Sequence, residues 1–205
     1  DFHRWYDEEH VPARIVLPGF LAARRFAAVT GSDDFLAIYE ADGRKAFMTP
    51  EYAALRQNPS PRTRRMLAAV DGFTRYLAEE ISDTGPASDG AFLSINAFAV
   101  PPERAEAFDD WYESEHTPRL MEEPDWLRVR RYRIVEGTGG PWTHLALHEL
   151  ASREAMDSPA RTHARSGPKR DALARENWFN ASGRWLYRCI NRAAAPASMS
   201  VAPAN

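Results

Sequence analysis

The sequence predicts an α+β protein made of two similar halves. The first observation is a motif of the form F-x-x-W-Y-x-x-E-H-x-P, which occurs at residues 2–12 and again at residues 108–118, an offset of 106. The second is that strand-like and helix-like periodicities follow each other in a fixed order after each copy. The third is a segment rich in turn formers at residues 83–90, between the halves.

The repeat extends beyond the motif itself. Arg24 corresponds to Arg130 at the same offset, and Glu40 corresponds to Glu149 at an offset of 109, after an insertion in a glycine-rich turn. Each unit therefore covers about a hundred residues, the size of a small domain rather than of a solenoid repeat. The sequence predicts a tandem duplication.

The second half gives the element order. Residues 92–100 alternate as a strand does, residues 103–116 have helical spacing, and Pro118 is expected to end that helix. The remaining elements are expected to be a hairpin at 126–135 and 143–150, a helix at 159–176 and a strand at 184–190. The order β-α-β-β-α-β is that of a ferredoxin-like unit, with both helices on one face of the sheet.

Two such units can cover each other's free sheet faces, so we expect an intrachain pseudo-dimer packed sheet to sheet. Further homo-oligomerisation is compatible with this. The expected boundaries are a first repeat at 1–82, a linker at 83–90, a second repeat at 91–191 and a flexible tail at 192–205.

The first half has no counterpart of the strand at 92–100, because its copy of the motif begins at Phe2. A ferredoxin-like unit without that central strand would leave backbone groups unpaired. We therefore expect the natural polypeptide to begin roughly 15–20 residues earlier, from the repeat register.

Composition predicts a soluble cytoplasmic protein. The chain is 44% hydrophobic and 27% charged with a net charge of −3, and no apolar run is long enough for a membrane span. The excess of acids argues against a nucleic-acid partner. The single Cys189 excludes an internal disulfide.

The repeated W-Y-x-x-E-H-x-P helix in a β-α-β-β-α-β frame resembles the dimeric α/β-barrel superfamily, particularly its EthD-like and stress-responsive relatives. That resemblance implies a pocket between helices and sheet in each unit. It leaves the reaction open, since members include cofactor-free oxygenases, polyketide cyclases, isomerases, dehydratases, decarboxylases and distant haem enzymes. We expect no organic cofactor.

His10 and His116, at the end of each motif helix, are the leading catalytic candidates. An imidazole can accept and donate a proton near neutral pH. The alternative is that each histidine caps free carbonyls in the last turn of its helix and is stabilised there as a cation.

His144 and His148 share a strand face and are further catalytic candidates, while the first half has Phe35 and Tyr39 in those places. The second half is therefore expected to hold the more polar pocket. A metal or haem site at these histidines is a weaker alternative, and the prediction is that no metal is bound.

Other residues are expected to bind the substrate. Asn96 could stabilise an oxyanion, and the arginines could hold a carboxylate or enolate, although cross-strand salt bridges to Glu40 and Glu149 are the favoured alternative for them. The expected substrate-binding residues are Trp111, Tyr112, Trp5, Tyr6, Asn96, Arg130, Arg24 and Trp142.

Three functions remain open. The first is a cofactor-free enzyme that uses histidine acid–base chemistry for elimination, isomerisation or cyclisation of a hydrophobic aromatic or polyketide-like carbonyl compound, and is thus a lyase or isomerase. The second is a cofactor-free oxygenase of a phenolic substrate. The third is a ligand-binding or accessory protein without catalysis.

Overall fold

The computed structural model describes residues 1–88 and 90–196. The chain divides into two compact units, which are described separately. Unit 1 comprises Asp1–Ala27, Asp34–Phe73 and the described residues from Ile190 onward, and unit 2 comprises Ala28–Asp33 and Thr74–Cys189.

Unit 2 contains most of the strands. In chain order its elements are β3 (Arg75–Thr84), β4 (Phe92–Phe98), η3 (Pro102–Arg104), α5 (Ala105–Trp111), η4 (Tyr112–His116), α6 (Thr117–Leu120), β5 (Trp126–Thr138), β6 (His144–Leu150), η5 (Glu154–Asp157), α7 (Pro159–Ala164), α8 (Pro168–Leu173), α9 (Asn177–Asn180) and the first part of β7 (Gly183–Ala194). The strands are hydrogen-bonded in the order β7-β4-β6-β5-β3.

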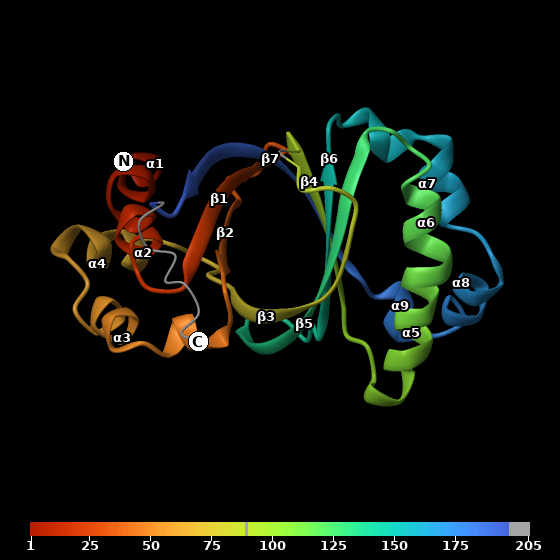
Figure 1. Cartoon of the computed structure of the whole chain (residues 1–205), viewed down its shortest axis with the longest axis horizontal. Coiled ribbons are helices and arrows are strands. Elements are labelled where there is room, and N and C mark those ends of the chain that lie inside the picture. Colours follow the sequence, from red (N-terminus) through yellow and green to blue (C-terminus); the bar gives the residue numbers. More distant parts are fainter. Residues whose placement is uncertain (89, 197–205) are drawn as a thin grey trace, which may run out of the picture. The chain divides into compact units, whose positions relative to one another are not determined.

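From β4 to β7, unit 2 has the order β-α-β-β-α-β, and β4 pairs antiparallel with both β6 and β7. This is the ferredoxin-like arrangement expected for the second half. Helices α5 to α9 lie on one side of these strands (Figure 1). Because successive strand residues face opposite sides, Ser94, Asn96 and Phe98 point to one face of the sheet and Leu93, Ile95 and Ala97 to the other.

The core of unit 2 lies between β4, β6 and the helices. One cluster joins Phe98 of the sheet to Phe108, Trp111 and Tyr112 of the motif helix and to Phe179 of α9. These side chains are at most 4% exposed, so their burial contributes on the order of 2 kcal/mol each to folding. The motif helix is thus fixed against the sheet by its aromatic face.

Unit 1 has fewer strands. Its elements are α1 (Phe2–Trp5), η1 (Tyr6–His10), α2 (Pro12–Ile15), β1 (Phe20–Ala28), β2 (Phe35–Ala41), η2 (Arg44–Met48), α3 (Pro50–Gln57), α4 (Pro61–Ala68) and the end of β7. The strand order is β2-β1-β7, and β1 pairs antiparallel with β2. Val11, Ile15 and Ala23 form one small core, and Phe20, Ala46 and Tyr52 form another.

Two expectations about helices are wrong. The helix of the second motif does not end before Pro118 but continues as α6 to Leu120. A π-helical turn makes this possible, because the N–H of Thr117 binds the carbonyl of Tyr112, and Pro118 at the start of α6 needs no N–H donor. The expected helix at 159–176 is instead two short helices, α7 and α8, since Gly167 with φ +111° followed by Pro168 breaks it.

The predicted domain boundaries at residues 82 and 91 stay a prediction. Strand β3, which falls in the first repeat by sequence, belongs to unit 2 by its contacts with β5. Strand β7 runs to Ala194, beyond the expected end at residue 190, so the first residues of the tail predicted at 192–205 are strand. Residues 197–205 of that tail lie outside the described residues.

The predicted cytoplasmic location also stays a prediction. Within residues 1–88 and 90–196, no helix combines the length and the apolar character that crossing a bilayer requires.

Candidate functional site

Both copies of the motif contain a π-helical turn, at Tyr6–His10 and at Tyr112–His116. An α-helix would clash with the proline two residues after each histidine, and the wider turn avoids this. It places each histidine ring beside the tryptophan five residues earlier, with ring centres 4.4 Å apart in the first copy and 4.5 Å in the second. Inserted π turns of this kind are frequent at functional sites.

Unit 2 holds a cavity of about 280 Å³ between the motif helix, strands β4, β6 and β7, and the segment from η5 to α9. This volume lies near the lower end of the range for small-molecule sites. Five residues predicted from the sequence line it: His116, His148, Asn96, Trp111 and Tyr112. Its other apolar lining includes Phe98, Leu120, Trp126, Met156, Phe179, Trp185 and Leu186.

His116 is buried at the cavity wall, and one of its nitrogens has a fixed partner. Its Nδ1 lies 2.8 Å from the carbonyl oxygen of Ala164, which can only accept a hydrogen bond, so Nδ1 carries the proton. Burial, and then the charges of Arg170, Arg165 and Arg131, lower the pKa of His116 to about 4. At neutral pH the ring is therefore neutral, and Nε2, which has no hydrogen bond within the described residues, is a proton acceptor.

His148 has the opposite tautomer. The indole N–H of Trp126 can only donate, and it lies 3.2 Å from Nδ1 of His148. Burial lowers the pKa of His148 well below its usual value, so the neutral ring carries its proton on Nε2. That Nε2 lies 3.1 Å from the side-chain Nδ2 of Asn96. Because two donors cannot bind each other, the tautomer of His148 requires the Asn96 amide to be turned by 180°, so that its oxygen accepts from Nε2. The Asn96 amide group is left with its N–H donors directed elsewhere, on a residue that lines the cavity.

The ring of Tyr112 packs against Arg131. The guanidinium of Arg131 stacks over the Tyr112 ring at 4.5 Å and binds Glu113 at 2.7 Å as well as Asp109. Burial raises the pKa of Tyr112, and Arg131 and the Asn96 amide oppose that shift. The phenol therefore stays protonated at neutral pH.

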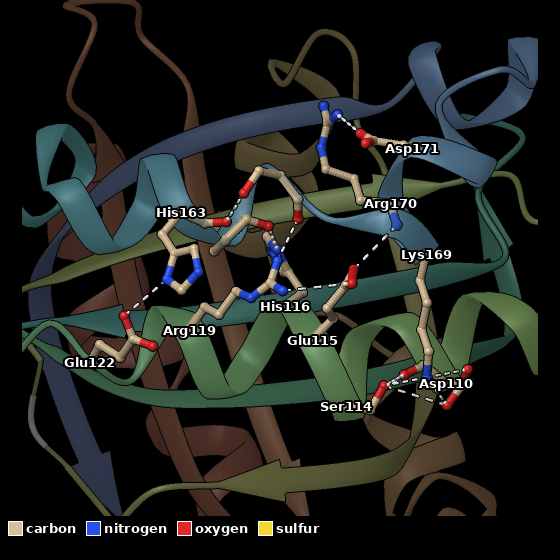
Figure 2. A network of polar contacts seen from close by, with 12 residues as sticks. Asp110, Ser114, Glu115, His116, Arg119, Glu122, His163, Lys169, Arg170 and Asp171 are labelled. Atoms are coloured by element: carbon tan, nitrogen blue, oxygen red, sulfur yellow. Dashed lines mark hydrogen bonds and ion pairs between the residues drawn. The ribbon is translucent and has the colours of Figure 1, made fainter.

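A network of polar contacts ties the motif helix to the segment that follows α7 (Figure 2). Glu115 accepts a hydrogen bond from the backbone N–H of Arg170 at 3.3 Å and lies 3.7 Å from Arg119. Lys169 donates to Asp110 and Ser114 of the motif helix at 2.8 and 2.7 Å. Glu115 thus joins the motif helix to the first turn of α8 and lies beside an arginine of its own helical segment.

Unit 1 repeats part of this arrangement. Glu9 binds Ser60 and Thr63 at the start of α4, and Arg25 stacks over Tyr6 at 4.5 Å. Burial lowers the pKa of His10 to about 3, and its Nδ1 has no hydrogen-bond partner within the described residues. His10 therefore lacks the contact that fixes the tautomer of His116.

Other predicted site residues lie outside the cavity lining. Arg24 binds Glu40 at 3.1 Å, and Arg130 binds Glu149 at 3.0 Å with both side chains at most 4% exposed. These are the cross-strand salt bridges that were the favoured alternative for the two arginines.

Two further predicted residues in unit 2 also have other partners. His144 binds Thr143 at 2.9 Å and packs on Phe108, while Trp142 packs on Trp185. Among the described residues, no group of three or more His, Cys, Asp or Glu side chains is placed to hold a metal ion.

Sequence reasoning missed most of the positive charge at the site. Arg161, Arg165, Arg170 and Arg184 all line the cavity. None of the four was among the expected substrate-binding residues, although Arg184 begins the strand expected at 184–190. The helical spacing of Arg161 and Arg165, four residues apart, was the available signal for a shared face.

Solved structures share this fold. No family model and no curated protein matches the sequence. An anthrone oxidase-like protein superimposes with a TM-score of 0.68 at 12% identity, over 98% of this chain and 90% of that one. A candidate monooxygenase from Fusobacterium nucleatum gives 0.57 at 10% identity over 93% and 88%, and a major regulator of staphylococcal pathogenesis gives 0.52 at 18% over 92% of each.

At these identities the likeness concerns the fold alone. It is consistent with the expected ferredoxin-like barrel fold, whereas membership of the superfamily and the specific relation to EthD-like proteins stay predictions.

Proposed function

We propose that this protein is a small-molecule enzyme in which Nε2 of His116 removes a proton from a carbon next to a carbonyl group. The main support for this proposal is the hydrogen bond from Nδ1 of His116 to the carbonyl of Ala164, which leaves Nε2 as the proton acceptor. A general base must present an unprotonated nitrogen at working pH, and burial keeps this ring neutral.

The proton abstracted from the substrate carbon moves to Nε2, and the electron pair of the C–H bond becomes an enolate on the carbonyl oxygen. With the Asn96 amide turned so that its oxygen accepts from Nε2 of His148, an N–H of Asn96 stabilises that enolate oxygen. Return of the proton to another carbon gives isomerisation, loss of a neighbouring group gives elimination, and attack on a second carbonyl gives cyclisation.

The apolar walls favour a flat, hydrophobic substrate. Trp111, Trp126 and Phe179 line the cavity that His116 and Asn96 share. Aromatic rings stack on such surfaces at low entropic cost. The substrate class is therefore an aromatic or polyketide-like carbonyl compound.

An oxygenase is the second candidate, and the names of the structural neighbours favour it. One is an anthrone oxidase-like protein and another a candidate monooxygenase. In this reaction the same deprotonation at a CH₂ group is followed by attack on O₂. One oxygen atom stays as a new carbonyl and the other leaves as water, so that O₂ is the oxidant.

We infer further that the chain is a tandem duplication of a ferredoxin-like unit related to EthD-like proteins. The repeated motif supports this, because both copies have the π-helical turn, the tryptophan–histidine contact and an arginine over the tyrosine.

Exchange of carbon-bound hydrogen tests the proposal without knowledge of the product. In D₂O under nitrogen, we expect the protein to accelerate deuterium exchange at the CH₂ group next to the carbonyl of 1-tetralone, and at the CH₂ group of anthrone, which is conjugated to its carbonyl through the aromatic rings. His116→Gln should reduce that acceleration by about 10²-fold or more. His163→Gln, which changes an exposed histidine bound to Glu122, is the matched control and should exchange at the wild-type rate.

Unchanged exchange in a folded His116→Gln protein would contradict the role of His116. Binding of these ketones without any exchange would support the non-catalytic reading instead. Oxygen uptake in air, in parallel with substrate loss, separates the oxygenase from the lyase or isomerase.

A further inference from the structure

The lining of the unit 2 cavity is strongly unbalanced in charge. Among the residues that the structure describes, four arginines line it, and no aspartate or glutamate does. The two histidines there are neutral at physiological pH because burial lowers the pKa of each. The cavity therefore presents positive charge only.

Within the described residues, no carboxylate forms an ion pair with Arg165 or Arg184, and the carboxylates near Arg161 and Arg170 make only weak contacts with them. Glu115 accepts from the Arg170 backbone and lies beside Arg119. Asp171 is 3.9 Å from Arg170 on the exposed surface, and Asp157 acts on Arg161 only through its charge. The guanidinium of Arg165 has no hydrogen bond or ion pair within the described residues, and Arg184 donates to the hydroxyl of Ser182 at 3.1 Å.

The charges also act on one another. Burial first, and then the charge of Arg165, lower the pKa of both Arg161 and Arg184. Like charges around one cavity destabilise the unliganded protein, and an anion placed among them would relieve this. Protein surfaces that gather guanidinium groups in this way are suited to carboxylate, sulfonate or phosphate groups.

The arginines and the proposed base lie at different depths. Arg165 and Arg184 are exposed, Arg161 and Arg170 are half-buried, and His116 and His148 are buried. Apolar side chains such as Trp111 and Phe179 complete the wall. A ligand could thus hold an anionic group at the rim while its apolar body reaches the histidines.

We propose that the unit 2 cavity binds amphipathic anions, in which an aromatic body carries a carboxylate or similar group that Arg165 and Arg184 hold at the rim. This proposal rests on the proposed function for the location of the reacting carbon. It adds the anionic group as the feature that selects the substrate.

Binding of 1-naphthoate and of its neutral isostere 1-naphthamide, measured by calorimetry, tests the proposal. Wild-type protein should bind the carboxylate at least tenfold more tightly than the amide. Raising NaCl from 20 to 200 mM should lower the affinity for the carboxylate and leave the affinity for the amide unchanged. The double variant Arg165→Gln/Arg184→Gln should lose this preference and keep the affinity for the amide.

Arg175→Gln is the control, since it removes one exposed positive charge outside the cavity lining and should leave both affinities within twofold. Equal binding of the two compounds by the wild type, equal weakening of both in the double variant, or binding of neither at millimolar concentration would overturn the proposal. Circular dichroism verifies that each variant is folded.

The outcome is separable from that of the proposed function. His116→Gln should keep the preference for 1-naphthoate while it loses hydrogen exchange. If hydrogen exchange does not depend on His116 but the wild type prefers the carboxylate, the anion site is supported and the catalytic role of His116 is contradicted.

Discussion

At the scale of single residues, the hydrogen-bond partner of His116 decides what the side chain can do. The sequence left two readings, a catalytic base or a cationic cap of its own helix. In the structure His116 does bind a helix-terminal carbonyl, but that carbonyl belongs to Ala164 at the end of α7. The lowered pKa also means that the ring is neutral rather than cationic.

The pH dependence of stability follows from the same residue. The pKa of His116 is about 4 in the folded protein, against 6.5 for an unperturbed histidine, so the unfolded state binds more protons between these values. The free energy of unfolding should therefore fall as the pH drops through this window and be insensitive to His116 above it. At pH 5 the loss relative to pH 7 from this residue is about 2 kcal/mol.

Urea denaturation at pH 7 and pH 5 measures this loss. His116→Gln should show a smaller difference between the two pH values than the wild type by about that amount. The remaining difference should come partly from His10 and His148, whose pKa values burial also lowers. An identical pH response in the variant and the wild type would contradict the assignment.

At the scale of elements, two features determine the shape of the motif helix. The proline is visible in the sequence, whereas the π-helical turn before it is visible only in the structure. Pro118 correctly marked a disturbance of the helix, but the disturbance is a π-helical turn within it and not its end. Local spacing could not reveal this, because the extra residue per turn is stabilised by packing of Trp111 and Tyr112 in the core.

Gly167 controls the position of the segment that carries Ala164 and Arg170. Its φ of +111° suits glycine, and an added Cβ would come within 2.6 Å of both Arg119 and Glu115. Gly167→Ala should therefore lower the free energy of unfolding by about 3 kcal/mol. It should also weaken the contact that fixes the tautomer of His116.

Gly31→Ala is the matched control for this change. Gly31 also has a positive φ, +77°, but a Cβ there would meet nothing within 4 Å. Gly31→Ala should lower the free energy of unfolding by about 1 kcal/mol, from backbone strain alone. Equal losses at the two positions in chemical denaturation would show that the contacts with Arg119 and Glu115 are unimportant.

At the scale of the whole molecule, the two halves contain the same helical motif but differ in the strand that follows the glycine-rich turn or its counterpart. His148 of the second half corresponds to Tyr39 of the first, and His144 to Phe35. His148 holds the Asn96 amide in unit 2, whereas Tyr39 packs in the small core that contains Val11 and Ile15. The chemistry is therefore expected in unit 2.

His10→Gln tests this asymmetry. Hydrogen exchange should change by less than twofold, because the histidine in unit 1 lacks the carbonyl partner that orients His116. Calorimetry of the wild type should give one 1-naphthoate per chain. Two ligands per chain, or a loss of half the exchange rate in His10→Gln, would indicate that both units are active.

The sequence by itself determined the repeat, the order of strands and helices in the second half, and the five predicted residues that line the cavity. Strand alternation, helical spacing and a motif present twice are local signals, and they carry over directly into local structure. The salt bridges of Arg24 and Arg130 were also predictable from it, since Glu40 and Glu149 lie on the strands expected to pair with those of the two arginines.

Only the tertiary structure decided what these residues do together. The helical segment after β6 carries Arg161, Arg165 and Arg170. These three arginines line the same cavity as Arg184 and His116 only because elements far apart in the sequence pack together. The tautomers of His116 and His148 depend on Ala164, Trp126 and Asn96, each far away in sequence. Such contacts depend on side-chain packing and hydrogen-bond geometry between separate elements, which the periodicity of one element does not encode.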